Sequence, residues 1–172
     1  CMIVINNVRA FKKNDTKCTK YSKNQKNKEE LSMNRLKGKI AVITGGNSGV
    51  GAATAKLFAA EGATVVITAR REAALKEVAD EITAAGGEVY AVSTDISKPE
   101  DPEMLMQKVM DKYGKIDILV NNAGILEQGL KPIDKFLDED MDRIIETNEK
   151  GTMRCMSCLL YTSDAADDGE SV

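Results

Sequence analysis

Residues 44–51 read Thr44-Gly45-Gly46-Asn47-Ser48-Gly49-Val50-Gly51 and connect an apolar, β-branched run at 40–43 with a helix-like segment at 52–61. A strand, a glycine turn and a helix in this order aim the free N–H groups and the positive dipole end of the helix at an anion. The stretch therefore predicts a cradle for the phosphates of a nucleotide.

The three spaced glycines have separate expected tasks. Gly45 ends the strand in a turn that favours a positive φ, Gly49 leaves room for a phosphate, and Gly51 lets the helix lie close to the sheet. Their spacing, Gly-x-x-x-Gly-x-Gly, differs from the commonest dinucleotide fingerprint, and a P-loop lysine is absent. An ordinary tight turn is the alternative for the glycines alone, but the flanking strand and helix argue against it.

Composition favours one soluble α/β domain without a membrane segment. The chain has 172 residues, of which 42% are hydrophobic, and no apolar run is long enough to span a bilayer. Histidine is absent, which excludes histidine catalysis and histidine-containing zinc sites, and the cysteines form no metal-ligand grouping. Cys155-x-x-Cys158 resembles a redox pair, but reduced thiols in a cytoplasmic protein are the favoured interpretation.

Charge separates the first 32 residues from the rest. Residues 1–32 carry a net charge of +5, which leaves −8 for residues 33–172. This basic segment lacks apolar periodicity and clustered aromatics, so we expect a disordered or non-native extension and no nucleic-acid partner. Lys28-Glu29-Glu30 can be encoded by AAG-GAG-GAA, which resembles a bacterial ribosome-binding sequence, and we hypothesise that translation starts at Met33.

From Met33 onward, strand and helix patterns alternate. Strands are expected at 40–43, 64–68, 88–93 and 116–120, and helices at 52–61, 72–85 and from Pro99 or Pro102 to about Gly114. In the first helix Val50, Ala53 and Leu57 share one face. This alternation predicts a parallel sheet with helices on both faces and ligands at the carboxyl ends of the strands.

Distinctive residues follow three of these strands. They are the glycine cradle, Asp95, and the run Asn121-Asn122-Ala123-Gly124. Over about residues 33–157 this combination resembles the short-chain dehydrogenase/reductase family. The resemblance implies a Rossmann-like, doubly wound parallel sheet, truncated to about four strands in the order 3-2-1-4 with flanking helices, and it makes 33–157 a partial dinucleotide-binding domain.

The resemblance also implies which residues hold the cofactor. The phosphates and the adjoining ribose would lie against Gly45, Asn47, Ser48, Gly49, Val50 and Gly51. Asp95 and Ile96 would contact the adenine, and Asn121, Ala123 and Gly124 the ribose on the nicotinamide side. Alternatives are a turn-forming Asp95 and a tether between neighbouring strands for the asparagines, which is compatible with ligand contact.

The end of the second expected strand bears on the choice of cofactor. It reads Thr68-Ala69-Arg70-Arg71 and lacks the acid that would accept hydrogen bonds from a ribose 2′-OH. Arg70 can form charge-assisted contacts with a 2′-phosphate, so we expect NADP to be preferred, with NAD possible. The alternative is that both arginines are merely solvated at a helix start, and Ser48 lacks the basic side chain of many NADP-binding relatives.

Asn148 is the expected catalytic-support residue. Met141, Ile144 and Ile145 form an apolar helical stripe, and Asn148 follows on the same face one turn later. In the resembled family the matching Asn helps to hold a water connected to the active-site Lys. The alternative is a core Asn satisfied by local backbone.

The rest of the family's catalytic machinery cannot be placed. The resemblance calls for a Ser and for a Tyr that is followed four residues later by Lys. At that spacing the chain has Thr94 after Tyr90, Asp117 after Tyr113 and Ala165 after Tyr161, so none of these tyrosines has the required Lys. We expect an intact parent enzyme that transfers hydride between NADP(H) and an alcohol or carbonyl substrate, and a fragment that is inactive alone. A nonenzymatic nucleotide-binding or sensor protein is the alternative.

The sequence also allows predictions about the carboxyl-terminal tail and about the assembly state. The sequence of residues 158–167 resembles the translation of a transposase-based sequencing adaptor, so we interpret 158–172 as an artefactual, disordered tail; a natural acidic tail is the alternative. The resemblance implies a homo-oligomer formed through helices around 105–110 and 141–156.

Overall fold

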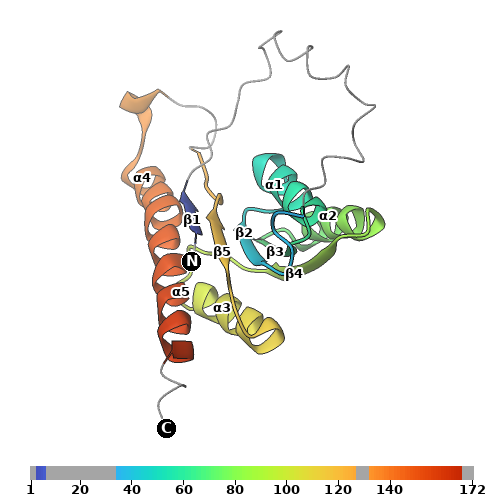
Figure 1. The fold of residues 1–172 in the computed structure, drawn as a ribbon. Helices are drawn as coiled ribbons and strands as arrows, with labels where there is room; N and C mark the ends of the chain where they lie inside the picture. Colours follow the sequence, from blue (N-terminus) through green and yellow to red (C-terminus); the bar gives the residue numbers. More distant parts are fainter. Residues whose placement is uncertain (1–2, 7–33, 127–131, 168–172) are drawn as a thin grey trace.

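A computed structural model describes residues 3–6, 34–126 and 132–167, with side chains for 34–126 and 132–160. Its sheet is parallel, with the strand order β1-β5-β2-β3-β4 (Figure 1). The strands are β1 (Ile3–Asn6), β2 (Ile40–Thr44), β3 (Thr64–Ala69), β4 (Glu88–Ser93) and β5 (Ile118–Asn121). The run β4-β3-β2-β5 is the predicted order 3-2-1-4, so the Rossmann-like fold is confirmed.

Helices cover both faces of this sheet. Their bounds are α1 (Gly49–Ala60), α2 (Glu72–Ala84), α3 (Glu100–Tyr113), the short 3₁₀ helix η3 (Ile133–Lys135), α4 (Asp138–Ile145), the π-helical turn η4 (Glu146–Lys150) and α5 (Gly151–Asp167). The core places α1 and α2 on one face and α3 and α5 on the other, and α3 runs beside α5 (Figure 1). None of the helices in the described residues is long and apolar enough to cross a bilayer.

The core follows from the two-residue repeat of the strands. In β2, Ala41 and Ile43 face α1 and α2, whereas Val42 faces α3 and α5, and all three are fully buried. A strand covered on both faces must be apolar throughout, which explains the continuous hydrophobic run before the glycine turn. Amphipathic helices bury one stripe, and the core accordingly contains Leu75, Val78 and Ile82 of α2 and Leu105 and Val109 of α3.

The first helix packs on a different face from the one expected. Its buried residues are Gly51, Ala52 and Ala55, while Leu57 is 55% exposed. Small side chains lie against the sheet because α1 approaches it closely, which leaves no room for the larger residues. The periodicity of the apolar residues therefore gave the wrong phase for α1.

Strand β1 lies within the segment 1–32 that was expected to be disordered or non-native, and its four residues are ordered as a strand. Ile3–Asn6 pairs in parallel with β5, from Ile3 opposite Ile118 to Asn6 opposite Asn121. Its backbone satisfies the N–H and C=O groups that the edge of β5 would otherwise leave open. Residues 7–33 of the predicted extension lie outside the described part of the chain.

Helix α5 likewise corrects the expectation of disorder from residue 158. The helix continues to Asp167, and Leu159 is fully buried beside Cys155 in the core shared with α3. Leu159 lies one turn after Cys155 on the same helical face, so burial of this face stabilises the continuation. Residues 168–172 lie outside the described range.

The amino-terminal edge of the sheet is closed by a charge cluster. The Asp117 carboxylate accepts hydrogen bonds from the Ile40 N–H at 2.9 Å and from the Lys39 ammonium at 3.0 Å, and it pairs with Lys115 at 3.0 Å. Burial opposes ionisation of Asp117, but these donors outweigh it and lower the pKa of the carboxyl. The cluster thus joins the starts of β2 and β5.

Replacing Asp117 with Asn should lower the free energy of unfolding at about pH 7 by roughly 1.5 to 3 kcal/mol, because a partly buried charged acceptor is lost. A carboxyl with a lowered folded-state pKa stabilises above its unfolded value, near about 3.9, and loses this effect as pH falls through the folded value. The deficit of Asp117→Asn should therefore shrink at about pH 3, as measured by urea unfolding.

Asp80→Asn is the matched control, since Asp80 is 66% exposed and pairs with Lys76 one turn away. Its effect should stay below about 0.5 kcal/mol. Equal effects for the two variants would contradict a stabilising role for the Asp117 cluster.

Candidate functional site

A cavity of about 240 Å³ opens at the carboxyl ends of the strands. It is lined by residues that follow β2, β3, β4 and β5. In sheets of this topology, ligands bind at the carboxyl ends of the strands. Of the predicted cofactor residues, those lining the cavity are Gly45, Asn47, Ser48, Arg70, Asp95, Ile96, Ala123 and Gly124. Residues at the ends of separate strands thus meet at one site.

The glycine loop has the positive φ predicted for Gly45, whereas the close contact of Gly51 is with the loop itself. Gly45 has a φ of +67° and Gly49 a φ of +55°, both in the left-handed region. A Cβ on Gly45 would lie 2.9 Å from the Ala123 Cα, and a Cβ on Gly51 would overlap the Gly45 carbonyl oxygen. Gly51 therefore acts in packing the loop rather than in lining the cavity.

The amino terminus of α1 is left available to an anion. Ser48 occupies the N-cap position in extended conformation without a side-chain capping bond, and the first turn carries no acidic residue. The first N–H groups of a helix have no intrahelical partners, and here no side-chain cap from Ser48 replaces them. This arrangement suits a phosphate group.

Arg71 reaches across the cavity to the glycine loop. The Asn47 amide is satisfied only when its oxygen faces the guanidinium, at 2.9 Å from Nη2 and 3.2 Å from Nε of Arg71. Arg70 lines the same cavity. Two guanidinium groups therefore lie at the carboxyl end of β3.

Thr44 and Asn122 tie the ends of β2 and β5 together. The Thr44 hydroxyl oxygen accepts hydrogen bonds from the N–H groups of Asn122 and Ala123, each at 3.0 Å. In return the Asn122 amide donates to the carbonyls of Thr44 and Gly45, at 3.1 and 3.2 Å. The tethering role considered for Asn122 is therefore present in the structure.

Asp95 is fixed by the loop that follows β4. Its Oδ1 accepts hydrogen bonds from the N–H and the hydroxyl of Ser97, at 3.1 and 2.7 Å. The Asp95 N–H donates to Asp101 Oδ2 at 2.8 Å. Asp95 thus forms a turn, as the alternative interpretation proposed, while it also lines the cavity.

Asn148 anchors the opposite wall. Its Oδ1 accepts from the Ile125 N–H at 2.8 Å, and its Nδ2 donates to the Ile125 carbonyl at 2.9 Å. The Asn148 carbonyl accepts from the Thr152 hydroxyl at 2.8 Å. The side chain is therefore satisfied by the backbone of Ile125, 23 residues earlier in the chain, and not by the local backbone of the alternative interpretation.

The apolar stripe before Asn148 does not face the core. Met141 and Ile145 are 40% and 41% exposed, and Asn148 is half-buried, whereas Thr147 is 8% exposed. The π-helical turn Glu146–Lys150 adds to the helical repeat and rotates the following residues out of phase with the stripe. Thr147 consequently faces the cavity.

Some predicted residues lie outside the cavity lining, and others were missed. Gly49, Val50, Gly51, Asn121 and Asn148 do not line it. The missed lining residues are Thr68, Ala69, Arg71, Thr94, Ile125 and Thr147. Most are chain neighbours of predicted residues, so extending each motif by one position would have found them.

The residues present fit a dinucleotide on structural grounds. The Thr68 hydroxyl oxygen is buried in the cavity wall and has no hydrogen-bond partner among the described residues. Such a group is costly unless a ligand or water satisfies it. Together with the uncapped α1 terminus and the glycine cradle, it indicates a site built for a polar, anionic ligand.

Neither a redox pair nor a metal site is supported in the described part. Burial raises the pKa of the Cys155 thiol to about 12, and burial also raises that of Cys158. Thiolates at such sites are scarce, which agrees with inert thiols. The residues with described side chains contain no cluster of three or more potential metal ligands.

Sequence comparisons connect this site to known proteins. A family model described as short chain dehydrogenase matches residues 39–171. An uncharacterized oxidoreductase, Lin0452 of Listeria innocua, is 34% identical over 137 residues, which cover 80% of this chain and 54% of the relative. Tropinone reductase-like 1 of Erythroxylum coca is 40% identical over 144 residues, which cover 75% of this chain and 52% of the relative. The chain spans about half the length of these curated relatives.

Solved structures agree. A metagenomic short-chain oxidoreductase in complex with NADP has a TM-score of 0.71 at 35% identity and covers 76% of this chain and 59% of its own. A short-chain type dehydrogenase/reductase from Mycobacterium marinum has a TM-score of 0.73 at 32% identity, and the match covers 82% of this chain and 56% of that protein.

Thr44→Val should reduce the free energy of unfolding by about 2 to 4 kcal/mol, because it keeps the shape but leaves two N–H groups without their acceptor. Thr44→Ser keeps the hydroxyl and should cost less than about 1.5 kcal/mol for the lost methyl group. Urea unfolding of both variants would measure this, and a serine variant as unstable as the valine variant would contradict the clamp.

Proposed function

The chain belongs to the short-chain dehydrogenase/reductase family, and from this we propose that the intact protein is an oxidoreductase that transfers hydride between NADP(H) and an alcohol or carbonyl substrate. The observation that carries the proposal is the cavity in which the glycine loop, Asp95 and the 121–124 run meet. When bound, the nicotinamide supplies or accepts the hydride.

We assign the parts of the cofactor to opposite ends of this cavity. The uncapped α1 terminus, with Asn47 and Ser48, would receive the phosphates, and Asp95 with Ile96 would receive the adenine. Ala123 and Gly124 would lie along the nicotinamide side. The remaining predicted residues, Gly49, Val50, Gly51 and Asn121, would act by shaping the loops.

The preference for NADP over NAD rests on charge. Arg70 and Arg71 both line the cavity beyond the end of β3, where an acid would select a 2′-OH. With the Asn47 amide oxygen turned toward it, Arg71 is held by Asn47, which partly organises its guanidinium for a phosphate. The NADP complex of the metagenomic relative is consistent with this assignment.

Arg70→Met should weaken NADP binding by about tenfold or more while changing NAD binding less than about twofold, because only NADP offers the 2′-phosphate. Arg71→Met should give a smaller loss, since Arg71 also bonds to Asn47. Isothermal titration with both cofactors would measure the effects, and Arg143→Met on α4 provides a control outside the cavity lining. Tighter binding of NAD than NADP by the wild-type chain would refute the preference.

Asn148 is proposed to support catalysis indirectly. Its side chain holds the Ile125 backbone, and its carbonyl lies in the π-helical turn. In the family the matching residue helps to hold a water connected to the active-site Lys. We assign it the role of fixing the nicotinamide-side loop and the turn.

We propose that these 172 residues bind cofactor without substantial turnover. None of Tyr90, Tyr113 and Tyr161 precedes a Lys at the spacing needed for a general acid with a lowered pKa. A steady-state assay of NADPH oxidation with a panel of aldehydes and ketones should therefore give rates close to those without protein. Robust turnover would overturn this proposal, whereas cofactor binding without turnover is also what a sensor would show.

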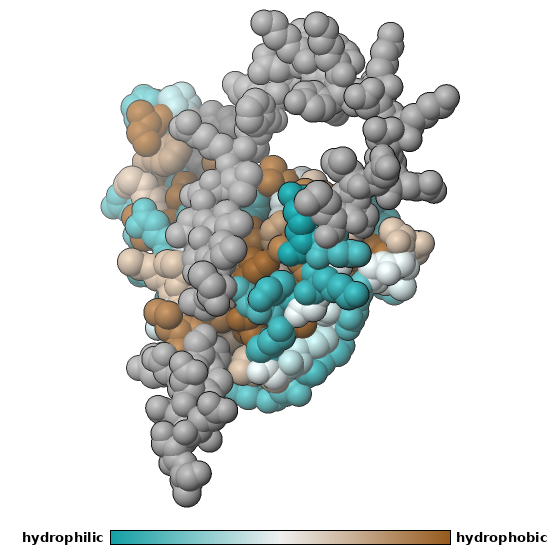
Figure 2. Space-filling model, in the orientation of Figure 1, coloured by the Kyte–Doolittle hydropathy of each residue, from teal (hydrophilic) through white to brown (hydrophobic). Residues whose placement is uncertain are grey.

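A homo-oligomer is the proposed assembly. Figure 2 shows hydrophobic residues exposed over α4 and the turn before it, at the upper left. The exposed residues here and on α5 include Ile133, Leu137, Met141, Ile145 and Met153. Apolar surface of this kind favours association with another copy.

A further inference from the structure

We propose that Arg154 is a positioning residue for the adenine end of the cofactor site, because it fastens the loop that presents Asp95 to helix α5. The inference rests on the proposed function, since it takes Asp95 as the adenine contact. Arg154 itself does not line the cavity and would act only through the loop.

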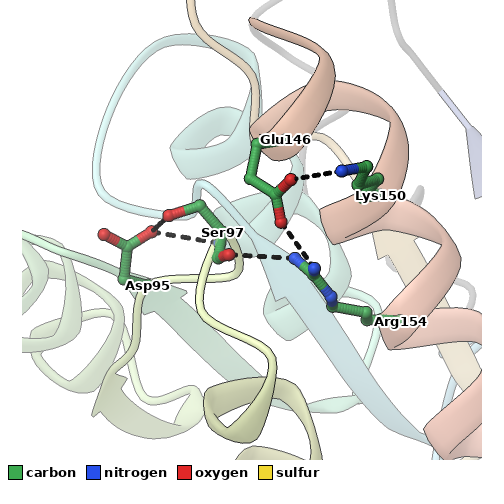
Figure 3. A network of polar contacts seen from close by, with 5 residues as sticks. All are labelled: Asp95, Ser97, Glu146, Lys150 and Arg154. Carbon is green, nitrogen blue, oxygen red and sulfur yellow. Dashed lines mark hydrogen bonds and ion pairs between the residues drawn. The ribbon is translucent and has the colours of Figure 1, made fainter. Parts of the chain in front are cut away.

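A chain of hydrogen bonds connects Arg154 to Asp95 (Figure 3). Arg154 Nη1 donates to the Ser97 carbonyl at 2.9 Å. Ser97 in turn donates from its N–H and its hydroxyl to Asp95 Oδ1, at 3.1 and 2.7 Å. The orientation of the Asp95 carboxylate therefore depends on Ser97, and the position of Ser97 depends on Arg154.

Arg154 is itself held in place from its other side. Its Nη2 contacts Glu146 Oε1 at 2.5 Å, and Glu146 Oε2 pairs with Lys150 at 2.7 Å. Hydrogen bonds from Lys150 and Arg154 keep the pKa of Glu146 below its usual range. The Arg154 side chain is only 24% exposed. A guanidinium fixed at two nitrogens loses little further freedom when it holds the loop.

The backbone provides a second contact between the same two elements. A Cβ on Gly151 would lie 2.9 Å from the Ile96 carbonyl oxygen, so the start of α5 packs directly against the loop. Gly151 precedes Arg154 by three residues and shares its helical face. The π-helical turn just before α5 carries Asn148, which binds Ile125. One continuous helical segment thus holds loops on both sides of the cavity.

The free oxygen of the Asp95 carboxylate determines which base the site should prefer. Asp95 Oδ1 is occupied by Ser97, while Oδ2 makes no hydrogen bond to any residue in the described ranges. A carboxylate oxygen can accept from the 6-amino group of adenine but not from the 6-keto oxygen of hypoxanthine. A well-positioned Asp95 should therefore discriminate between dinucleotides that carry these two bases.

The test compares NADPH with its hypoxanthine analogue in fluorescence titrations of the full 172-residue chain. The wild type should bind NADPH about tenfold more tightly than the analogue, as expected for one charge-assisted hydrogen bond. Arg154→Met should reduce this preference to within about twofold, and Arg154→Lys should retain part of it because lysine can still donate to Ser97.

Lys150→Met is the matched control, since it removes a cation from the same network without touching Ser97, and it should keep the wild-type preference. Should Arg154→Met fail to fold by circular dichroism, Ser97→Ala removes one bond to Asp95 directly and should lower the preference about threefold. An unchanged preference in folded Arg154→Met, or in Ser97→Ala, would overturn the proposal.

Binding by the wild-type chain distinguishes a failure of the Arg154 proposal from a failure of the proposed function. Tight binding of both dinucleotides without a base preference would overturn the role of Arg154 and leave the cofactor site standing. A wild-type chain that binds neither NADPH nor NADP would refute the proposed function and the inference with it.

Discussion

The hydrogen bonds that join the ends of β2 and β5 fix the geometry on which the cavity depends. These neighbouring strands are parallel, yet β2 leads to α1 on one face of the sheet, while β5 lies beside α5 on the other. Where connections diverge in this way a crevice opens at the carboxyl ends of the strands. Thr44 and Asn122 span that crevice at its base, so the glycine loop and the 121–124 run have one relative position.

The segment from η4 through α5 provides the second set of constraints. Asn148 reaches the loop after β5, whereas Gly151 and Arg154 reach the loop after β4. A π-helical turn lies between α4 and α5, and such turns change the direction in which successive side chains point. A regular helix could not present Thr147 and Asn148 in the observed directions with the same packing of α5 on α3.

Local signals in the sequence were sufficient for the strands and for the predicted loop conformations. The β-branched runs predicted β2, β3 and β4 to within a residue, and Gly45 has the positive φ expected of it. Predictions failed where a distant part of the chain decides the outcome. The phase of α1 depends on how close the sheet lies, and β1 forms because β5 offers an edge 115 residues later in the register of Ile3 with Ile118. No sequence motif pointed to Arg154, because its proposed role depends on a contact with Ser97 that forms only in the folded chain.

The two ends of the sheet differ in how completely their polar groups are satisfied. At the amino-terminal edge, Asp117 collects donors from Ile40, Lys39 and Lys115, which stabilise the fold and leave little capacity for a ligand. At the carboxyl edge, Ser48 does not cap α1 with its side chain, and the Thr68 hydroxyl has no partner among the described residues. Buried polar groups without partners lower the stability of a fold. The unpartnered Thr68 hydroxyl beside an uncapped helix terminus, at the end of the sheet opposite the paired Asp117 carboxylate, is the physical reason to place the ligand there.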